Sequence, residues 1–256
     1  PPTSALPPPQ KTPNATLPTP PGSATSTEGL PLFEQRAPEK IMLVVITSNK
    51  GLCGAFNANI VKQVHALIDG PYSEQHRAGN VRLICIGKKG NEQLSKVYPV
   101  VQYNETLLDN PEFSELAAIA DYLTSEFLLH NIDKVDIVYN QFLNAATQRV
   151  TVEEFLPISN LDTESTHAVN NDYIIEPSPQ EVLEALIPKI LKNQLYKTLS
   201  DSIASEHGAR MISMTKATDN ATEILRDLRL KYNNARQSSI TNELIEIVSG
   251  AEALKG

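Results

Sequence analysis

The chain has 256 residues, of which 41% are hydrophobic, and its formal net charge at pH 7 is −8. This length and apolar fraction allow one or two domains with a sizeable core, and the acidic balance argues against a general nucleic-acid binder. No apolar run approaches the roughly 18 residues that a membrane span needs, so no direct membrane insertion is expected.

A proline-rich lead, placed at residues 1–38, opens the chain. Eleven of the 18 prolines fall within it, mixed with Ser, Thr, Ala and Gly. A segment of this composition cannot bury enough apolar surface to offset the entropy lost on ordering. We therefore expect a linker or a disordered lead.

Strand-like and helix-like patterns alternate between residues 39 and 160. Strands are predicted at Ile41–Ser48, Val81–Gly87, Val97–Tyr103, Val135–Tyr139 and Arg149–Phe155, and helices at Ala55–Ile68 and Phe113–His130. The first two strands are continuous apolar runs, typical of strands covered on both faces, whereas the last alternates as an antiparallel edge strand does. This order predicts an α/β fold, an open αβα (Rossmann-like) sandwich of about five strands.

Two cysteines, Cys53 and Cys85, lie in or beside the predicted strands. Two isolated cysteines favour free, buried thiols in a reducing compartment, with a disulfide as the alternative. The five histidines are dispersed, and neither cysteine has a His or a second Cys near it in sequence. We therefore expect no catalytic residue, no metal site and no cofactor.

A connection, residues 161–177, leads to a long helix that we place at residues 178–256. Ser178, Pro179 and Glu181 form a capping box with proline at the first helical position, and Pro188 is expected to kink the first turns. Gly250 is expected to end the helix.

The stretch from Lys189 to Ser249 corresponds to about 90 Å of helix, more than the roughly 40 Å that a compact domain spans. Much of it must therefore project. Apolar residues recur at spacings of three and four from Leu183 to Leu228, which predicts packing against another helix. Lys231–Glu243 is nearly polar on all sides and fits inside a large polar collar. Nine Lys/Arg against five Asp/Glu between Leu186 and Ile240 favour an acidic partner.

The stretch ITSNKGLCGAFN, residues 46–57, has the strand–turn–helix layout of a phosphate-binding loop. A Walker loop needs Lys directly after its last glycine, and a dinucleotide fingerprint needs three glycines. Here Lys50 precedes Gly51, and only Gly54 follows. The turn therefore predicts close packing of a helix on a strand, without a nucleotide site.

The same turn resembles the Ser-Asp-Arg-Gly-Leu-Cys-Gly signature of gamma subunits, the central rotor shafts of F-type ATP synthases. Residues 174–214 (IIEPSPQ…ARMISM) and 229–254 (RLKYNNARQSSITNELIEIVSGAEAL) are similar to the same family. In that family the C-terminal helix forms an antiparallel coiled coil with an N-terminal helix. This shaft rises through a ring of alternating alpha and beta subunits, and the αβα domain lies beside the epsilon subunit and on the membrane c-ring.

The resemblance implies a non-catalytic rotor subunit that couples ion-driven rotation of the c-ring to ATP synthesis and hydrolysis on the beta subunits. It implies a peripheral position on the cytoplasmic face of a bacterial inner membrane, or alternatively on the mitochondrial matrix face. The family's N-terminal helix has no counterpart here. We therefore expect a truncated chain, with the lead as an insertion before the sandwich.

Three sets of residues match the family's contact segments. Contact with a beta-subunit loop is implied for Arg236, Gln237, Thr241 and Glu243. Contact with the acidic lower rim of the beta subunits is implied for Asn49, Lys50 and Cys53, where Asn-Lys replaces Asp-Arg and lacks the guanidinium fork. Contact with the c-ring and epsilon is implied for Ile174, Ile175, Glu176 and Pro177. A solvated helix face is the alternative for the first set, and a strand end with its cap for the third.

A different class of function stays open from the residues alone. The chain is alternatively a small αβα enzyme or binding domain whose helix is an oligomerisation arm. Glu153 and Glu154 are the adjacent carboxylates that would suggest acid–base chemistry. Neighbours on a strand point to opposite faces, so an alternating strand explains this pair better.

Overall fold

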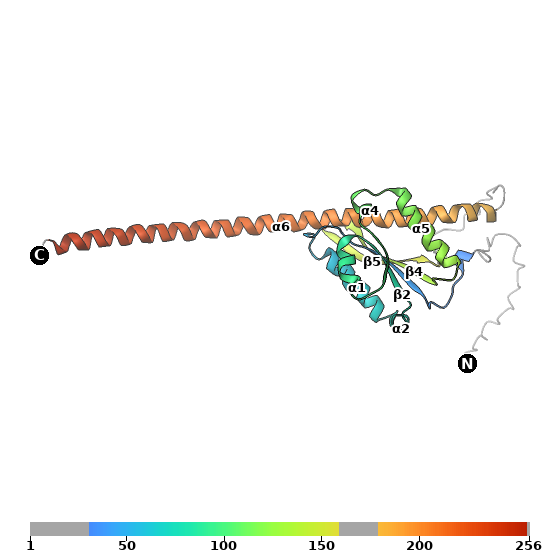
Figure 1. The fold of residues 1–256 in the computed structure, drawn as a ribbon. Helices are drawn as coiled ribbons and strands as arrows, with labels where there is room; N and C mark the ends of the chain where they lie inside the picture. The colour runs from blue at the N-terminus through green and yellow to red at the C-terminus, as the bar shows by residue number, and fades with distance from the viewer. Residues whose placement is uncertain (1–30, 159–178, 255–256) are drawn as a thin grey trace, which may run out of the picture.

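The computed structural model describes residues 31–158 and 179–254, and shows a sandwich from which one long helix projects (Figure 1). The strands are β1 (Ile41–Ile46), β2 (Val81–Ile86), β3 (Val100–Asn104), β4 (Lys134–Asn144) and β5 (Thr147–Leu156). They form one sheet in the order β3-β2-β1-β4-β5, with β5 antiparallel to β4 and the other pairs parallel. The predicted sandwich with an antiparallel edge strand is confirmed.

Helices cover both faces of this sheet. They are α1 (Phe56–Asp69), α2 (Ser73–Arg77), α3 (Lys88–Leu94), α4 (Thr106–Asp109), α5 (Phe113–Leu128) and α6 (Pro179–Ala253), with a 3-10 turn, η1, at Pro31–Phe33. The apolar patterns of the sequence predict α1, α5 and α6 but not the three short helices. Elements of 4 to 7 residues are too short to repeat an apolar pattern with a helical period.

The six residues of β1 are all buried, which explains its unbroken apolar run. Met42, Val44 and Ile46 pack in the layer that contains α5 and the first half of α6. Ile41, Leu43 and Val45 pack in the opposite layer, against α1. Successive side chains of a strand point to opposite faces, so a strand between two helical layers needs apolar residues at every position.

The apolar stripe of α6 has two different environments. Its first part, Ile187, Leu191, Leu195 and Leu199, is buried against the sandwich itself. This corrects the prediction that the whole stripe packs on another helix. Beyond Ser213 every described residue of α6 is exposed, so that part of the helix projects free of the sandwich (Figure 1).

Two predicted ends also differ from the structure. The helix α6 continues through Gly250 to Ala253, because glycine weakens a helix without excluding helical dihedral angles. Pro188 lies inside the helix. The strand β4 extends beyond the predicted Tyr139 to Asn144, since its polar end pairs with β5 alone in a protruding hairpin.

Residues 31–38, within the segment expected as lead, contact the sandwich. Leu32 is buried, and its carbonyl accepts a hydrogen bond from the Ile158 amide. The Arg36 guanidinium lies 4.6 Å from the centre of the Phe127 ring and donates to the Phe127 carbonyl. These contacts place the end of the expected lead on the α5 face. Ser178 of the predicted capping box lies outside the described residues.

Candidate functional site

The turn after β1 lies at the carboxyl edge of the sheet, where ligands bind to open α/β folds. The Ser48 hydroxyl donates to the Lys50 carbonyl at 2.6 Å, and the Ser48 amide donates to Asn57 Oδ1 at 3.0 Å. The Asn57 side-chain amide in turn donates to Ser48 Oγ at 2.7 Å and to Cys53 Sγ at 3.3 Å. The start of α1 is thereby fixed to the end of β1.

Asn49 links this turn to the residues that follow β2 and β3. Its amide nitrogen donates to the Glu105 carbonyl at 2.8 Å and to Asp109 Oδ2 at 3.1 Å, and its Oδ1 accepts from the Lys88 amide at 3.1 Å. Both polar atoms of the Asn49 side chain are therefore used within the sandwich. Asn49 therefore positions the turn.

The apex of the turn is strained and exposed. Leu52 has a φ of 64° and its side chain is 74% exposed. A non-glycine residue in the left-handed region costs about 1–2 kcal/mol and persists only where its surroundings impose it. The bonds of Ser48 and Asn49 provide that constraint, and the Lys50 side chain next to Leu52 is also exposed. The apex is a preorganised surface feature.

Cys53 differs from its neighbours because it faces inwards. Its side chain is 2% exposed and packs with α1, so its sulfur is not available to another subunit. In the isolated chain the surface of the turn is therefore formed by its other residues, Lys50, Gly51 and Leu52. In this structure Cys53 supports the turn whose apex is exposed.

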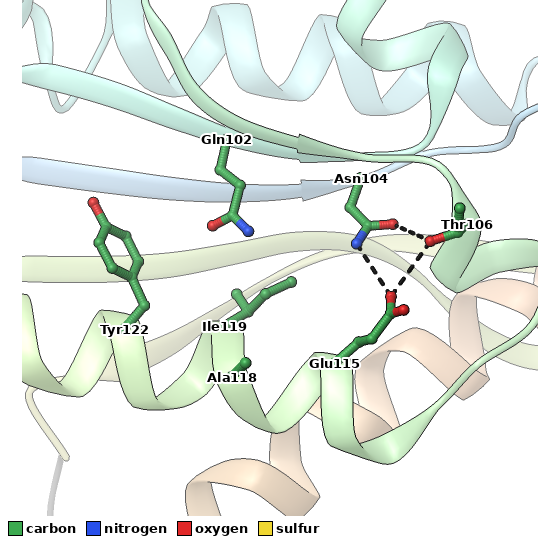
Figure 2. A pocket seen from close by; sticks show the side chains of 7 residues that line it. All are labelled: Gln102, Asn104, Thr106, Glu115, Ala118, Ile119 and Tyr122. Atoms are coloured by element: carbon green, nitrogen blue, oxygen red, sulfur yellow. Dashed lines mark hydrogen bonds between the residues drawn. The ribbon is translucent and has the colours of Figure 1, made fainter.

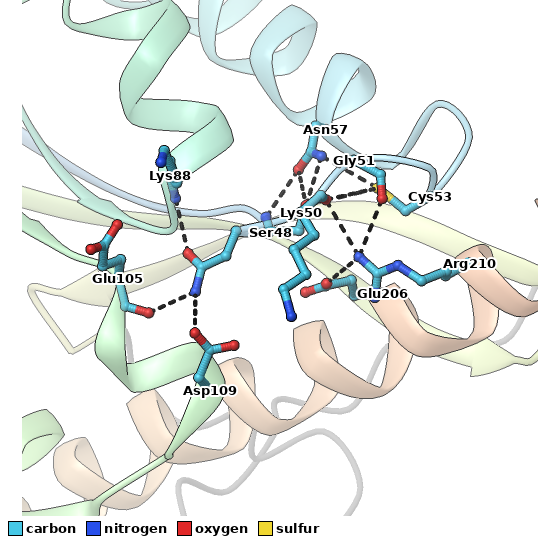
Figure 3. A network of polar contacts seen from close by, with 11 residues as sticks. Ser48, Lys50, Gly51, Cys53, Asn57, Lys88, Glu105, Asp109, Glu206 and Arg210 are labelled. Atoms are coloured by element: carbon cyan, nitrogen blue, oxygen red, sulfur yellow. Dashed lines mark hydrogen bonds and ion pairs between the residues drawn. The ribbon is translucent and has the colours of Figure 1, made fainter.

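The long helix α6 passes directly beside this turn (Figure 3). Arg210 forms an ion pair with Glu206 at 2.6 Å and also lies 3.4 Å from the Lys50 carbonyl and 3.5 Å from the Gly51 carbonyl. A cavity of only about 200 Å³ remains here, between the turn, α1, the β4–β5 hairpin and α6. The strand order reverses between β1 and β4, so α6 lies beside the crevice at which such folds bind ligands.

A second, open groove of about 500 Å³ lies between β3, α4 and α5 (Figure 2). Its polar residues bond to one another: Thr106 Oγ1 lies 3.0 Å from Asn104 Oδ1 and 3.3 Å from Glu115 Oε2. Among the described residues no three His, Cys, Asp or Glu side chains gather as metal ligands would. Nor does any described helix combine the length and apolarity that crossing a bilayer requires.

The four implied contact residues of α6 all lie on its projecting part. Arg236, Gln237, Thr241 and Glu243 are exposed. The Thr241 hydroxyl donates to the Gln237 carbonyl within the helix at 2.8 Å. The other implied set, Ile174, Ile175, Glu176 and Pro177, lies outside the described residues.

Both cysteines are free and buried, as predicted. Burial raises the pKa of the Cys85 thiol to about 12. At pH 8 about one molecule in ten thousand would then hold the reactive thiolate.

We expect native alkylation of Cys85 by iodoacetamide to be limited by unfolding, while Lys62→Cys, on the exposed face of α1, reacts at once. Mass spectrometry with and without denaturant measures both rates. Rapid native labelling of Cys85 would contradict this prediction.

Comparisons with known proteins agree with this architecture. The family model for ATP synthase matches residues 16–254. The chain is 52% identical over 222 residues to the ATP synthase gamma chain of Flavobacterium johnsoniae, which covers 87% of this chain and 76% of that relative. It is 47% identical over 224 residues to the ATP synthase gamma chain of Cytophaga hutchinsonii, with 86% and 76% covered.

Two solved structures show the same arrangement of sandwich and helix. The central stalk and c-ring structure of the Tetrahymena thermophila mitochondrial ATP synthase contains a chain that is 26% identical, with a TM-score of 0.54 and 72% and 79% of the two chains covered. A chain of the Euglena gracilis mitochondrial ATP synthase is 21% identical, with a TM-score of 0.62 and 85% and 73% covered.

A sandwich that fixes one long projecting helix is the arrangement of a central-stalk subunit of a rotary complex, as in the similar solved structure. The chain belongs to the ATP synthase gamma chain family. It is therefore a subunit of an ATP synthase, and the alternative of a separate small αβα enzyme is excluded.

Proposed function

We propose that this subunit is non-catalytic and transmits rotation between a membrane c-ring and the catalytic sites of beta subunits. The observation that carries the proposal is the exposed part of α6 beyond Ser213, a helix with no support from the sandwich. A long helix with an apolar stripe and a polar end is stable only when other chains surround it. The sandwich, with the first part of α6 packed on it, is the body, and we call the exposed part of α6 beyond Ser213 the shaft.

The beta-subunit contact residues are assigned from the family resemblance, and the exposure of their side chains supports the assignment. On the shaft, Arg236, Gln237, Thr241 and Glu243 are free to bind a beta-subunit loop, and Arg236 can grip a carboxylate in two places. On the body, the Lys50 side chain is the exposed charge of the turn that meets the acidic rim of the beta subunits. Asn49 and Cys53 hold that turn in place.

The remaining assignments rest on the family resemblance. Ile174, Ile175, Glu176 and Pro177 contact the c-ring and epsilon, and the ring around the shaft consists of alpha and beta subunits. The subunit lies on the cytoplasmic face of a bacterial inner membrane, in keeping with bacterial relatives such as those of Flavobacterium and Cytophaga.

Co-purification with alpha and beta subunits from the same organism tests the proposal. The chain is expected to join their complex, whereas a version that lacks residues 214–256 is expected to keep a folded sandwich and lose the association. The isolated chain is expected to bind no ATP in calorimetry. Equal association without the shaft, or ATP bound by the isolated chain, would overturn the proposal.

A further inference from the structure

The helix α6 is in contact with two separate parts of the sandwich at the point where it leaves it. On one side the Ser205 hydroxyl donates to the Asn140 carbonyl of β4 at 2.9 Å. One turn later Gly208 packs so closely against the β4–β5 hairpin that a Cβ there would lie 3.0 Å from the Ala145 carbonyl oxygen. The absence of a side chain at Gly208 is what permits this approach.

On the other side the turn after β1 is the neighbour. Arg210 reaches the Lys50 and Gly51 carbonyls, and Glu206 holds its guanidinium from one helical turn away. Gly54, with a φ of 61°, is so close to α6 that a Cβ there would lie 3.0 Å from Ser213 Oγ. We call Ser205, Gly208, Arg210 and Ser213, with their partners in the hairpin and the turn, the exit grip.

The two sides of the exit grip oppose each other around the helix. At 3.6 residues per turn, the mean direction of positions 205 and 208 lies about 140° from that of positions 210 and 213. The buried Ala209 lies between them. Rotation of the helix about its own axis in one sense therefore presses Ser205 and Gly208 into the hairpin and pulls Arg210 and Ser213 away from the turn. Rotation in the opposite sense does the reverse.

The contacts of the exit grip differ in kind from the packing of the earlier part of α6 on the sheet. Ile187, Leu191, Leu195 and Leu199 hold the helix on the sheet by burial, which is a non-directional force. Hydrogen bonds and close backbone contacts depend on angle and distance, so they fix an orientation. They occur at the last supported residues, since every described residue beyond Ser213 is exposed.

We propose that the exit grip sets the rotational position of the projecting shaft relative to the body, and that Arg210 is its positioning residue. The inference rests on the proposed rotor function, because only a subunit that transmits torque needs this angle to be stiff. Without the Arg210 contacts the helix stays packed on the sheet, but its projecting part twists more easily.

Angular fluctuations in the complete ATP synthase test this inference. The catalytic ring is fixed to a surface, a probe is attached to the sandwich, and the spread of probe angles is recorded while the enzyme waits at one catalytic position. Angular variance is inversely proportional to stiffness. Arg210→Ala removes one of two opposed contacts, so the variance is expected to rise by up to about twofold. Arg77→Ala is the matched control, since this exposed arginine lies on α2, which takes no part in the exit grip.

A second variant separates the carbonyl contacts from charge alone. Arg210→Lys keeps a cation for Glu206, but all three contacts of Arg210 are made by Nη2, and the lysine nitrogen lies one bond closer to the backbone. An ammonium that pairs with Glu206 therefore falls short of the carbonyls of the turn. The lysine variant is therefore expected to broaden the distribution as Arg210→Ala does, and it gives the answer if the alanine variant fails to assemble. Gly208→Val is expected to shift the mean angle, because its side chain displaces the helix from Ala145.

The outcomes distinguish this inference from the function on which it rests. A wild-type enzyme whose sandwich probe does not rotate would overturn the rotor function. Rotation with an unchanged variance in both Arg210 variants would overturn the exit grip alone. A lysine variant with wild-type variance would show that charge, and not the bridge to the turn, is what matters, and would also contradict the inference.

Discussion

Replacing Leu195 by alanine is expected to destabilise the isolated chain by about 2–5 kcal/mol, the range for large-to-small changes in a packed core. The Leu195 side chain is 0% exposed and lies in the layer that α6 forms with α5 and the sheet. Its matched control is Leu228→Ala on the same helix. Leu228 is 59% exposed, so its loss is expected to change the free energy of unfolding by less than about 0.5 kcal/mol.

Chemical denaturation of the two variants measures this difference. Hydrogen exchange of the unmodified chain, as a proven monomer, gives an independent check. Amides of β1 are expected to be strongly protected, and those of Leu225–Val248 to exchange quickly, because an unsupported helix frays. Equal protection of the two segments, or equal destabilisation by the two substitutions, would contradict the division of α6 into a packed and a projecting part.

The double change Arg236→Ala and Gln237→Ala is expected to lower ATP turnover of the complete enzyme by about tenfold or more. A charge-assisted hydrogen bond contributes about 1.5–3 kcal/mol, and a contact made in only some rotary positions acts on the rate of passage between them. The melting temperature of the isolated chain is expected to stay unchanged, since both residues are exposed and lose no contact with the sandwich.

Arg226→Ala is the control for this prediction, because it removes an exposed arginine from the same helix outside the polar segment Lys231–Glu243. Its effect on turnover is expected to be smaller. A complete enzyme with wild-type assembly, synthesis and hydrolysis after the double change would refute the proposed beta-subunit contact. A lower melting temperature would instead assign Arg236 and Gln237 a structural role.

The sequence was sufficient where a pattern is local. The unbroken apolar run at Ile41–Ile46 indicated a strand covered on both faces, and the alternation from Arg149 to Phe155 indicated the antiparallel edge. The glycines of residues 46–57 do not match any phosphate-binding motif, so no nucleotide site was predicted there. The length of α6 followed from the scarcity of glycine and proline, and the gamma-chain resemblance followed from three segments that span the turn and the helix.

Only the tertiary structure showed which part of the apolar side of α6 is covered. A period of 3.6 residues shows that one side of α6 is apolar, but Leu195 and Leu228 carry the same signal while only the first meets the sandwich. Asn49 was predicted to contact another subunit. Its side chain also bonds within the sandwich, to Glu105 and Asp109, which lie 56 and 60 positions away in the chain. The fold also decided which residues of the turn are accessible. The Cys53 side chain is buried, whereas the Lys50 side chain is exposed.

The sequence by itself therefore determined the strands, the three longer helices, their order and the family, because these depend on residue types at short, regular spacings. Only the tertiary structure showed that Gly208 and Arg210 meet opposite sides of the exit from the sandwich. Their partners lie in the β4–β5 hairpin and in the turn after β1, 160 residues from Arg210 in the case of the Lys50 carbonyl. Contacts at such separations are set by the path of the folded chain, which no local spacing encodes.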